Sequence, residues 1–264
     1  MSEKYIKFFE GFALAYGVAD MSTLKVDPES GKQKPDYRWN DEELTEQVYL
    51  NHLAGTQSIG VQPCNENSDA RFGVVDVDPK NYTDFDKKFF IDIIQNYNLP
   101  LIPVLSKSGG LHLYLFMSEF VPAVLIRSFL SNLLPLFKLK PDCEIFPKQT
   151  QLTKDNETGQ LNKGNFINLP YFKKSERVAI NIDGTAFTFN QFIEVVESNT
   201  TTPEKLKTIT EGIEQKDLEG VDAEFDDGPP CLAHLSKIMR NPGFDGKDRF
   251  MYNYHVFVKM KYGD

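Results

Sequence analysis

The sequence predicts an α+β fold, and three observations support this class. Apolar residues recur at helical spacing in some segments and alternate in others, so helices and strands are interspersed along the chain. Two pairs of expected strands are separated by short turns, Ser108-Gly109-Gly110 and Asp183-Gly184, which are typical of antiparallel hairpins. The length of 264 residues, 41% of them hydrophobic, suffices for one large domain or for one domain and part of another.

Helices are expected where helical periodicity begins at a capping residue. Asn40 or Asp41 caps a helix that Gly55 ends, and Pro122 lies near the first turn of a later one. The predicted helices cover residues 1–16, 41–55, 82–98, 122–137 and 191–199.

Strands are expected where apolar residues alternate between turn-forming segments. The predicted strands cover residues 58–63, 71–78, 100–106, 111–116, 143–147, 165–172, 177–182 and 185–189. Residues 25–40 are rich in turn-forming residues and are expected to form an exposed loop, and residues 149–164 a polar loop.

The domain organisation is expected to change near residue 199. A core over residues 1–198 is followed by an acidic segment without periodicity, residues 199–230, which we interpret as a linker. Residues 231–264 contain two helical patterns, which cannot bury both of their faces alone. We therefore expect them to be the start of a C-terminal helical domain of a longer protein.

The composition excludes several classes. No apolar run approaches the roughly 20 residues of a membrane-spanning helix, and the N-terminus lacks the apolar core of a signal peptide. Three dispersed cysteines, Cys64, Cys143 and Cys231, indicate neither a disulfide framework nor a zinc site. An intracellular, cytoplasmic location is therefore expected.

The net charge of −9 argues mildly against a protein covered by nucleic acid. Residues 138–177 are locally basic, however. These lysines form either a binding face or scattered surface positions, and the sequence does not decide between the two.

Acidic residues at a strand end are the first candidate site. Asp76 and Asp78 alternate with Val75 and Val77, so both carboxylates face the same side of a strand, about 7 Å apart at their Cα atoms. Such a pair attracts cations, and two divalent ions bridged by carboxylates are a common device for phosphoryl transfer. Alone, the pair is more simply read as solvated acids.

A second acidic segment, PDCEIFPK, adds a third carboxylate. Glu144 is the better-placed candidate because it alternates with Ile145, and Asp142 is the alternative. Lys148, just beyond this strand, could contact a phosphate or could be an ordinary surface lysine.

The stretch SKSGGLH is the third candidate. Ser106, Lys107, Ser108 and Gly110 could form an anion cradle of hydroxyl groups, backbone N–H groups and one positive charge, beside His112 at the start of a strand. The simpler interpretation is a hairpin turn followed by a structural histidine. Acids in one place and an anion cradle in another together indicate a site for a nucleotide and metal ions.

These motifs, in this order, resemble the archaeo-eukaryotic primase superfamily. The matching segments are VVDVD at 74–78, SKSGGLH at 106–112, EIFPKQ at 144–149 and GNFINLP at 164–170. Trp39 with LTEQVYLNHLAGTQSIGVQP, and GPPCL near 228–232, extend the resemblance over roughly residues 35–264. It is strongest with the primase-polymerase branch found in phages, plasmids and mobile elements.

The resemblance implies a two-part catalytic core, with a palm-like sheet related to RNA-recognition (RRM-like) folds and an N-terminal α/β module, followed by a short helical segment. It implies template-directed nucleotidyl transfer during replication of a phage or mobile element. Asp76, Asp78 and Glu144 would hold two Mg²⁺ or Mn²⁺ ions, and no zinc is expected. The partners would be single-stranded DNA, an NTP or dNTP, and a replicative helicase.

The resemblance also assigns the binding residues. Those expected to contact the nucleotide are Ser106, Lys107, Ser108, Gly110, His112, Lys148 and Asn165. Those expected to contact the template are Lys163, Tyr171, Lys173 and Lys174. Base stacking on exposed aromatic rings would supplement lysine–phosphate contacts.

Two other functions fit part of the pattern. A metal-dependent nuclease would also use clustered acids and a lysine, but Glu144 and Lys148 are four positions apart rather than two, and a nuclease needs no triphosphate cradle. A nucleic-acid-binding module without catalysis would not depend on the acids.

Overall fold

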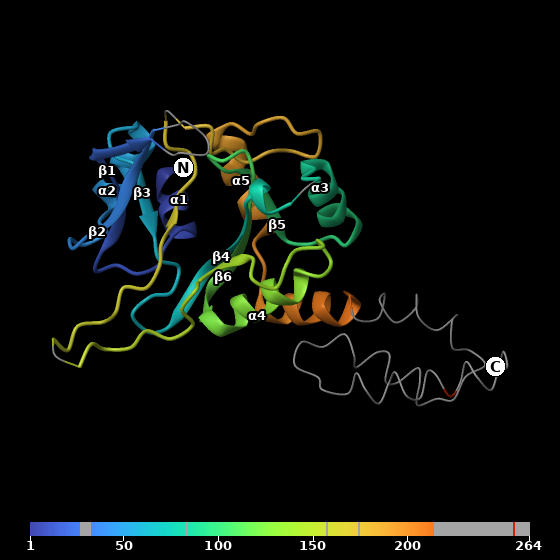
Figure 1. Ribbon diagram of the computed structural model, residues 1–264. Helices are drawn as coiled ribbons and strands as arrows, with labels where there is room; N and C mark the ends of the chain where they lie inside the picture. Colours follow the sequence, from blue (N-terminus) through green and yellow to red (C-terminus); the bar gives the residue numbers. More distant parts are fainter. Residues whose placement is uncertain (27–32, 83, 157, 174, 214–255, 257–264) are drawn as a thin grey trace. The chain divides into compact units, whose positions relative to one another are not determined.

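The computed structural model describes residues 1–26, 33–82, 84–156, 158–173, 175–213 and 256. The chain divides into two units, residues 1–206 and 207–264, and the first contains all the strands named below. Within it, helices are mixed with two antiparallel sheets, which confirms the predicted α+β class (Figure 1).

The five helices predicted over residues 1–199 are present, but several are shorter than expected. Helix α2 begins after Thr45 rather than at Asn40 or Asp41, α1 ends at Phe8 rather than near residue 16, and α3 begins at Lys87 rather than at residue 82. Gly55 ends α2 in the left-handed conformation (φ 80°), and Thr188 with Gln191 forms a capping box at the start of α5. The helices are α1 (Ser2–Phe8), α2 (Glu46–Ala54), α3 (Lys87–Asn96), α4 (Ala123–Leu133) and α5 (Phe189–Asn199), with a 3₁₀ turn, η1 (Pro79–Asn81).

The first sheet, here called the N-terminal sheet, has the order β2-β1-β3-β8. Its strands are β1 (Tyr16–Val26), β2 (Gln33–Asn40), β3 (Ile59–Val61) and β8 (Ile167–Asn168). The expected exposed loop over residues 25–40 is wrong, because most of it is strand: β1 and β2 pair in antiparallel fashion from Tyr16↔Asn40 outward. Polar and aromatic residues alternate in DYRWN, and this period of two is the strand signal that its turn-forming residues obscured.

Two glycines make room for an aromatic ring on this sheet. A Cβ atom built on Gly17 or Gly60 would lie 2.3 Å from the ring of Phe166, so the ring lies directly on the backbone of β1 and β3. Trp39 completes the contact edge-on, with its ring centroid 5.0 Å from that of Phe166. The segment before β8 is thereby fixed to the N-terminal sheet.

The second sheet, here called the central sheet, has the order β5-β6-β4-β7. Its strands are β4 (Asp69–Val77), β5 (Leu101–Leu105), β6 (Leu111–Pro122) and β7 (Glu144–Phe146). Helix α4 covers one face, where a Cβ atom on Gly73 would meet Ile126 at 2.3 Å and Leu130 at 2.9 Å (Figure 1).

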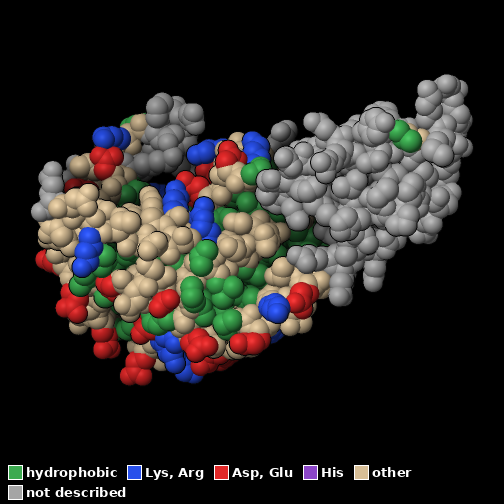
Figure 2. Space-filling model, turned by 90° about the horizontal axis from the view of Figure 1, so that it is seen from below, with side chains coloured by type: hydrophobic (Ala, Val, Ile, Leu, Met, Phe, Trp, Pro, Cys, Tyr) green, Lys and Arg blue, Asp and Glu red, His purple; other side chains and the backbone are tan. Residues whose placement is uncertain are grey.

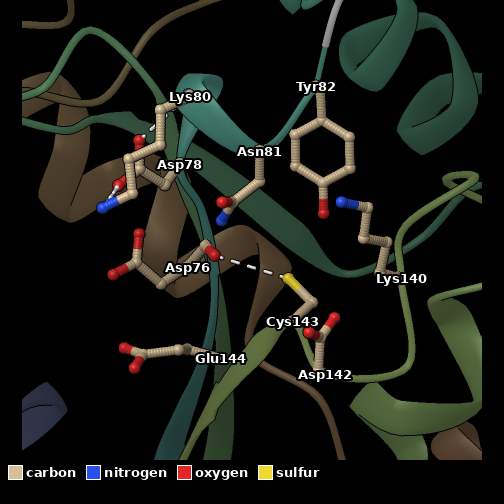
Figure 3. A pocket seen from close by; sticks show the side chains of 9 residues that line it. All are labelled: Asp76, Asp78, Lys80, Asn81, Tyr82, Lys140, Asp142, Cys143 and Glu144. Carbon is tan, nitrogen blue, oxygen red and sulfur yellow. Dashed lines mark hydrogen bonds and ion pairs between the residues drawn. The ribbon is translucent and has the colours of Figure 1, made fainter.

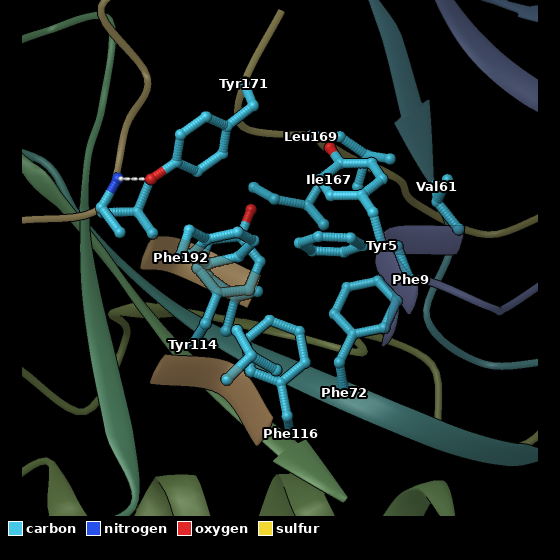
Figure 4. Packing of buried hydrophobic residues seen from close by; sticks show 14 of the residues in the cluster. Tyr5, Phe9, Val61, Phe72, Tyr114, Phe116, Ile167, Leu169, Tyr171 and Phe192 are labelled. Atoms are coloured by element: carbon cyan, nitrogen blue, oxygen red, sulfur yellow. Dashed lines mark hydrogen bonds between the residues drawn. The ribbon is translucent and has the colours of Figure 1, made fainter. Parts of the chain in front are cut away.

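The opposite face of the central sheet forms the main core. Rings from α1, α5, β4 and β6 pack there against apolar residues of the N-terminal sheet (Figure 4). Phe9 lies at the centre, with its ring centroid 5.3 Å from those of Phe72 and Phe116 and 5.7 Å from that of Tyr114. Each such buried ring contributes about 1.5–3 kcal/mol from burial, so this cluster joins the two sheets.

The Asp183-Gly184 turn is also present. Asn181 donates its backbone N–H to the Thr185 carbonyl at 2.8 Å, and Gly184 has φ +80°. Its flanking strands are reduced to isolated bridges, Ile180↔Ala186 and Val104↔Ala179.

The expected linker and C-terminal helices lie mostly outside the described residues. Residues 203–213 are helical, so the first part of the segment interpreted as a linker has regular structure. The domain boundaries of the sequence analysis stay a prediction. Within the described ranges, every helix is too short or too polar to span a lipid bilayer.

Candidate functional site

Strand pairing in the central sheet places three predicted site residues in one row. Asp76 on β4 lies directly opposite His112 on β6 and directly opposite Glu144 on β7. Directly opposed residues of antiparallel strands project to the same face, with Cβ atoms about 4.5–5.5 Å apart. The row continues the face that forms the main core, so the apolar packing ends where these polar side chains begin.

Asp76 and His112 form the inner part of the row. The His112 Nε2 atom lies 3.4 Å from Asp76 Oδ1, and the imidazole is buried, with 6% of the residue exposed. Its Nδ1 atom has no hydrogen-bond partner among the described residues. A buried ring nitrogen without a partner is costly, which makes His112 a candidate for contacting a ligand that binds beside it.

Asp78 lies just beyond the end of β4. Its carboxylate accepts a hydrogen bond from the Lys80 backbone N–H at 3.2 Å, which caps η1, and pairs with the Lys80 ammonium at 2.9 Å. Asp76 and Asp78 therefore lie on the same wall of one pocket, as the alternation predicted (Figure 3).

Glu144 joins this wall from β7. Figure 3 shows its side chain on the same side as the carboxylate of Asp76, whereas Asp142 points away. The Lys148 ammonium pairs with Glu144 Oε1 at 2.8 Å and lies 5.3 Å from the centre of the Phe146 ring. On this placement Glu144 remains the better candidate of the two acids.

Two contacts hold the backbone of the row. Arg127 of α4 donates to the carbonyls of Ile145 and Pro147 at 2.8 and 2.9 Å, which fixes the end of β7. The Cys143 thiol lies 3.4 Å from the carbonyl of Asp76. Burial, followed by nearby acids, raises the pKa of this thiol to about 11, so it is a neutral donor at neutral pH.

The pocket has a volume of about 320 Å³, and the sequence analysis missed part of its lining, here called the second wall (Figure 3). The residues of this second wall are Lys80, Asn81, Tyr82 and Lys140. Burial, followed by Cys143, raises the pKa of Tyr82 to about 12. The signal that could have found this wall is the position of Lys80, two residues after Asp78.

The donor set suits a hard divalent cation, because carboxylate oxygens are the ligands that Mg²⁺ and Mn²⁺ prefer. Among the described residues, no group of three His, Cys, Asp or Glu side chains is close enough together to hold an ion. Instead, the ammonium groups of Lys80 and Lys148 stand beside two of the carboxylates as cations. The carboxylates therefore suit a metal ion in their chemistry, but in this arrangement they are not close enough together to hold one, and two of them are paired with lysines.

The SKSGG turn joins β5 to β6 beside the end of β4. A Cβ atom on Gly110 would lie 2.1 Å from the Val77 carbonyl, so only glycine allows this approach. Within the turn, the Gly109 N–H donates a hydrogen bond to the Ser106 carbonyl, and the Gly110 N–H donates one to the Ser106 hydroxyl. Lys107 and Ser108 are exposed, whereas Ser106 is buried, and the hydroxyl groups of Ser106 and Ser108 are hydrogen-bonded to each other at 2.9 Å.

Asn165 lies in a bridge between the two sheets. Its side-chain oxygen accepts from Gln149 Nε2 at 2.7 Å, and its backbone N–H donates to Gln149 Oε1 at 3.0 Å. The buried Gln62, after β3, donates to the same Gln149 oxygen at 3.3 Å and to the Lys163 carbonyl at 3.2 Å. Asn165 therefore orders the segment after Lys148.

The predicted template residues are placed less favourably. Lys163 is half-buried and ion-paired with Asp41, and Lys173 is exposed. Tyr171 is a correction: it is 9% exposed, its hydroxyl donates to the Phe187 carbonyl, and its ring packs on Phe192. A ring buried in this way cannot stack on a base. Lys174 lies outside the described residues.

The fold and the acid–histidine row agree with the class that the motifs resembled, an archaeo-eukaryotic primase core. Residues 23–209 match the family model described as "TOTE conflict system, Archaeo-Eukaryotic Primase domain". The chain belongs to this family, so the predicted superfamily is confirmed.

Two further comparisons add little. The solved structure described as "Crystal structure of primase RepB'" aligns with 98% of this chain and 92% of its own, at 12% identity and a TM-score of 0.34, too low to support a conclusion. No curated protein matched the chain.

Proposed function

We propose that this primase domain catalyses template-directed nucleotidyl transfer from an NTP or dNTP to a primer 3′-hydroxyl or to an initiating nucleotide on single-stranded DNA. The observation that supports this most strongly is the row of His112, Asp76 and Glu144 across three strands of the central sheet, with Asp78 beside it. In the reaction, the hydroxyl oxygen bonds to the α-phosphorus as the bond to pyrophosphate breaks.

The proposed metal ligands are Asp76, Asp78 and Glu144, holding two Mg²⁺ or Mn²⁺ ions. When bound, these ions would lower the pKa of the attacking hydroxyl and neutralise the charge that develops on the pyrophosphate. The register of β6, β4 and β7 keeps the side chains of Asp76 and Glu144 on one face of the sheet. The hydrogen bonds of Arg127 hold β7 in this register.

The chain's own polar groups would bind and orient the triphosphate. Lys107 and Ser108 are exposed on the turn between β5 and β6, and the ring of His112 lies next to Asp76. Lys148 would leave Glu144 to contact a phosphate oxygen, as the motif resemblance implied. Asn165 would act through Gln149, by fixing the segment that carries Lys148.

The template would bind through lysine–phosphate contacts, including Lys163 and Lys173. In the part of the surface that Figure 2 shows and the structure describes, basic side chains are interspersed with acidic ones, without a continuous basic area. We therefore expect moderate affinity with a clear salt dependence, which lysine–phosphate contacts always bring. A cytoplasmic role in replicating a phage or mobile element, with a replicative helicase as partner, completes this proposal.

The test offers the protein a single-stranded template, Mg²⁺ or Mn²⁺, and labelled NTPs or dNTPs, with and without a primer. Wild-type protein should extend the primer, and Asp76→Ala and Asp78→Ala should lose at least about a hundredfold in rate, because charge stabilisation by metal ions supplies several kcal/mol. Asp36→Ala is the matched control, since Asp36 is also an ion-paired acid but lies on the N-terminal sheet.

The result separates the alternatives. Degradation of the template that depends on Asp76 would favour a nuclease. Template binding without incorporation, unaffected by either substitution, would favour a non-catalytic binding module. Extension without initiation would locate priming outside the described residues.

A further inference from the structure

The second wall of the pocket has no role in the proposed reaction so far. It includes two lysines that line the same pocket as Asp76, Asp78 and Glu144: Lys80 lies beside Asp78, and Lys140 lies beside Tyr82 (Figure 3). Ser106, Ser108, His112 and Lys148, the residues expected to contact the triphosphate, do not line this pocket. The cations that do line it are therefore different ones.

We propose that Lys80 and Lys140 form a binding wall for the polyphosphate group of the substrate and for the pyrophosphate product. Lys80 is held by Asp78 until a divalent cation takes that carboxylate, and then moves its ammonium to the polyphosphate. This inference rests on the proposed function, because it assigns the leaving-group side of the same reaction.

The charges that line the pocket support this assignment. Four carboxylates, Asp76, Asp78, Asp142 and Glu144, face two lysines, which gives a formal charge of −2. A polyanion alone is repelled by this balance, whereas two divalent cations change it to +2. The pocket therefore favours metal ions first and a polyphosphate only with them.

The pair between Lys80 and Asp78 is suited to exchange. The two charged groups are 2.9 Å apart, but 71% of the Lys80 side chain is exposed. Ion pairs this exposed contribute only about 0–1 kcal/mol, so a divalent cation displaces the ammonium at little cost. The lysine remains tethered two residues from Asp78, at the mouth of the same pocket.

Lys140 is held in place by its own segment. The Tyr82 hydroxyl is hydrogen-bonded by the Lys140 backbone and the Cys143 side chain, which ties the residues before β7 to the residues after η1. Figure 3 shows the Lys140 side chain directed toward the Tyr82 hydroxyl. Both lysines line the same pocket, from different segments of the chain.

The size of the pocket agrees with the class of ligand. A volume of about 320 Å³ is at the lower end of small-molecule sites. It accommodates a polyphosphate group and its cations, and leaves the base and sugar outside, where a template could contact them.

The test measures binding in the absence of any template. Mn²⁺ binding is followed by electron paramagnetic resonance, and binding of inorganic pyrophosphate at saturating Mg²⁺ by calorimetry. Lys80→Ala should bind Mn²⁺ about two- to fivefold more tightly, because the competing ammonium is gone. The same variant should bind pyrophosphate about tenfold more weakly, because a charged contact is lost.

The other variants sharpen this opposite response. Lys140→Ala should weaken pyrophosphate binding without tightening Mn²⁺ binding, since no carboxylate is paired with it in the proposed exchange. Lys80→Arg should retain most pyrophosphate binding. Lys88→Ala is the matched control: its lysine is 73% exposed and paired with Asp92 on α3, away from the pocket, and should change neither measurement.

Failure of the wall and failure of the reaction are distinguishable. If Lys80→Ala and Lys140→Ala bind both ligands like the wild type, the binding wall is refuted even where primer extension succeeds. If Lys80→Ala binds Mn²⁺ more tightly and pyrophosphate more weakly than the wild type, but the wild type extends no primer, the binding wall is supported and the proposed function is refuted. Circular dichroism of each variant confirms that it is folded.

Discussion

Two buried histidines, one in each half of the core unit, have opposite surroundings. His52 of α2 is fully buried, accepts a hydrogen bond from the Ile59 N–H at Nδ1 and contacts the Pro170 carbonyl through Nε2 at 2.9 Å. His112 of β6 is nearly as buried, but its Nδ1 atom has no partner among the described residues and its Nε2 atom faces Asp76.

We expect this difference in hydrogen bonding to separate a structural histidine from one that contacts a ligand. Both ring nitrogens of His52 are used, so its neutral form is fixed with the proton on Nε2. Burial, followed by the charge of Arg177, lowers the pKa of His52 to about 4, against the hydrogen bond with Pro170, which raises it. The Nδ1 atom of His112 has no partner among the described residues, and in the proposed function this ring contacts the substrate.

The largest expected effect is on stability, from His52→Ala. The substitution leaves the Ile59 N–H without its partner and opens a cavity, while the Pro170 carbonyl keeps its hydrogen bond from the Tyr5 hydroxyl. The lost hydrogen bond and the cavity together should cost about 4 kcal/mol. Urea unfolding measures this. Nucleotidyl transfer by the remaining folded protein should be unchanged, and a loss of rate without a loss of stability would contradict the structural role.

The pH dependence of stability should depend on the same residue. Because the pKa of His52 is about 4 when folded and about 6.5 when unfolded, the unfolded chain binds the proton more readily. The contribution of His52 is thus fully present above pH 6.5, decreases as the pH falls toward 4 and is constant below, a change of about 3 kcal/mol. Unfolding of the wild type and of His52→Gln at pH 7 and pH 4.5 tests it: the variant should lose this part of the dependence.

His112→Gln should show the opposite pattern. Removing a donor beside the reacting groups is expected to lower the rate of nucleotidyl transfer about a hundredfold, equivalent to about 2.7 kcal/mol. Thermal unfolding should change little, because no hydrogen bond of the Nδ1 atom is lost. A large drop in melting temperature with normal activity would make His112 a structural residue like His52.

The smallest expected effect comes from adding a methyl group to the N-terminal sheet. Gly17→Ala in the N-terminal sheet forces the Phe166 ring away and should cost about 2 kcal/mol by overpacking. A second substitution, Phe166→Ala, removes the clash, so the double variant should be more stable than the sum of the single changes implies. Additive costs, measured by urea unfolding, would show that the ring does not lie on Gly17.

The sequence was sufficient for much of the central sheet. Alternation in VVDVD predicted that Asp76 and Asp78 lie on the same face of a strand. The glycines of SKSGG predicted the turn that brings the next strand back beside them. Both are local signals within a few residues, where the period of a strand determines which side chains face together.

The rest depends on pairing between distant segments, which the sequence does not display. Nothing near Asp76 indicates that β7 will place Glu144 opposite it, and nothing near Tyr171 indicates that its ring will meet Phe192 of α5. Lys80 and Lys140 join the pocket wall for the same reason. Alternation in PDCEIFPK made Glu144 a candidate, and the motif resemblance assigned it to the metal site, but neither indicated that it pairs opposite Asp76.

The N-terminal sheet has a consequence for where the chain can be cut. Its last strand, β8, follows all four strands of the central sheet in the sequence and pairs with β3 through Val61↔Ile167. A fragment ending before residue 167 would leave the backbone groups of β3 as an open edge, and open edges recruit strands from other molecules. We expect such fragments to self-associate, so that neither half of this core is a separable building block.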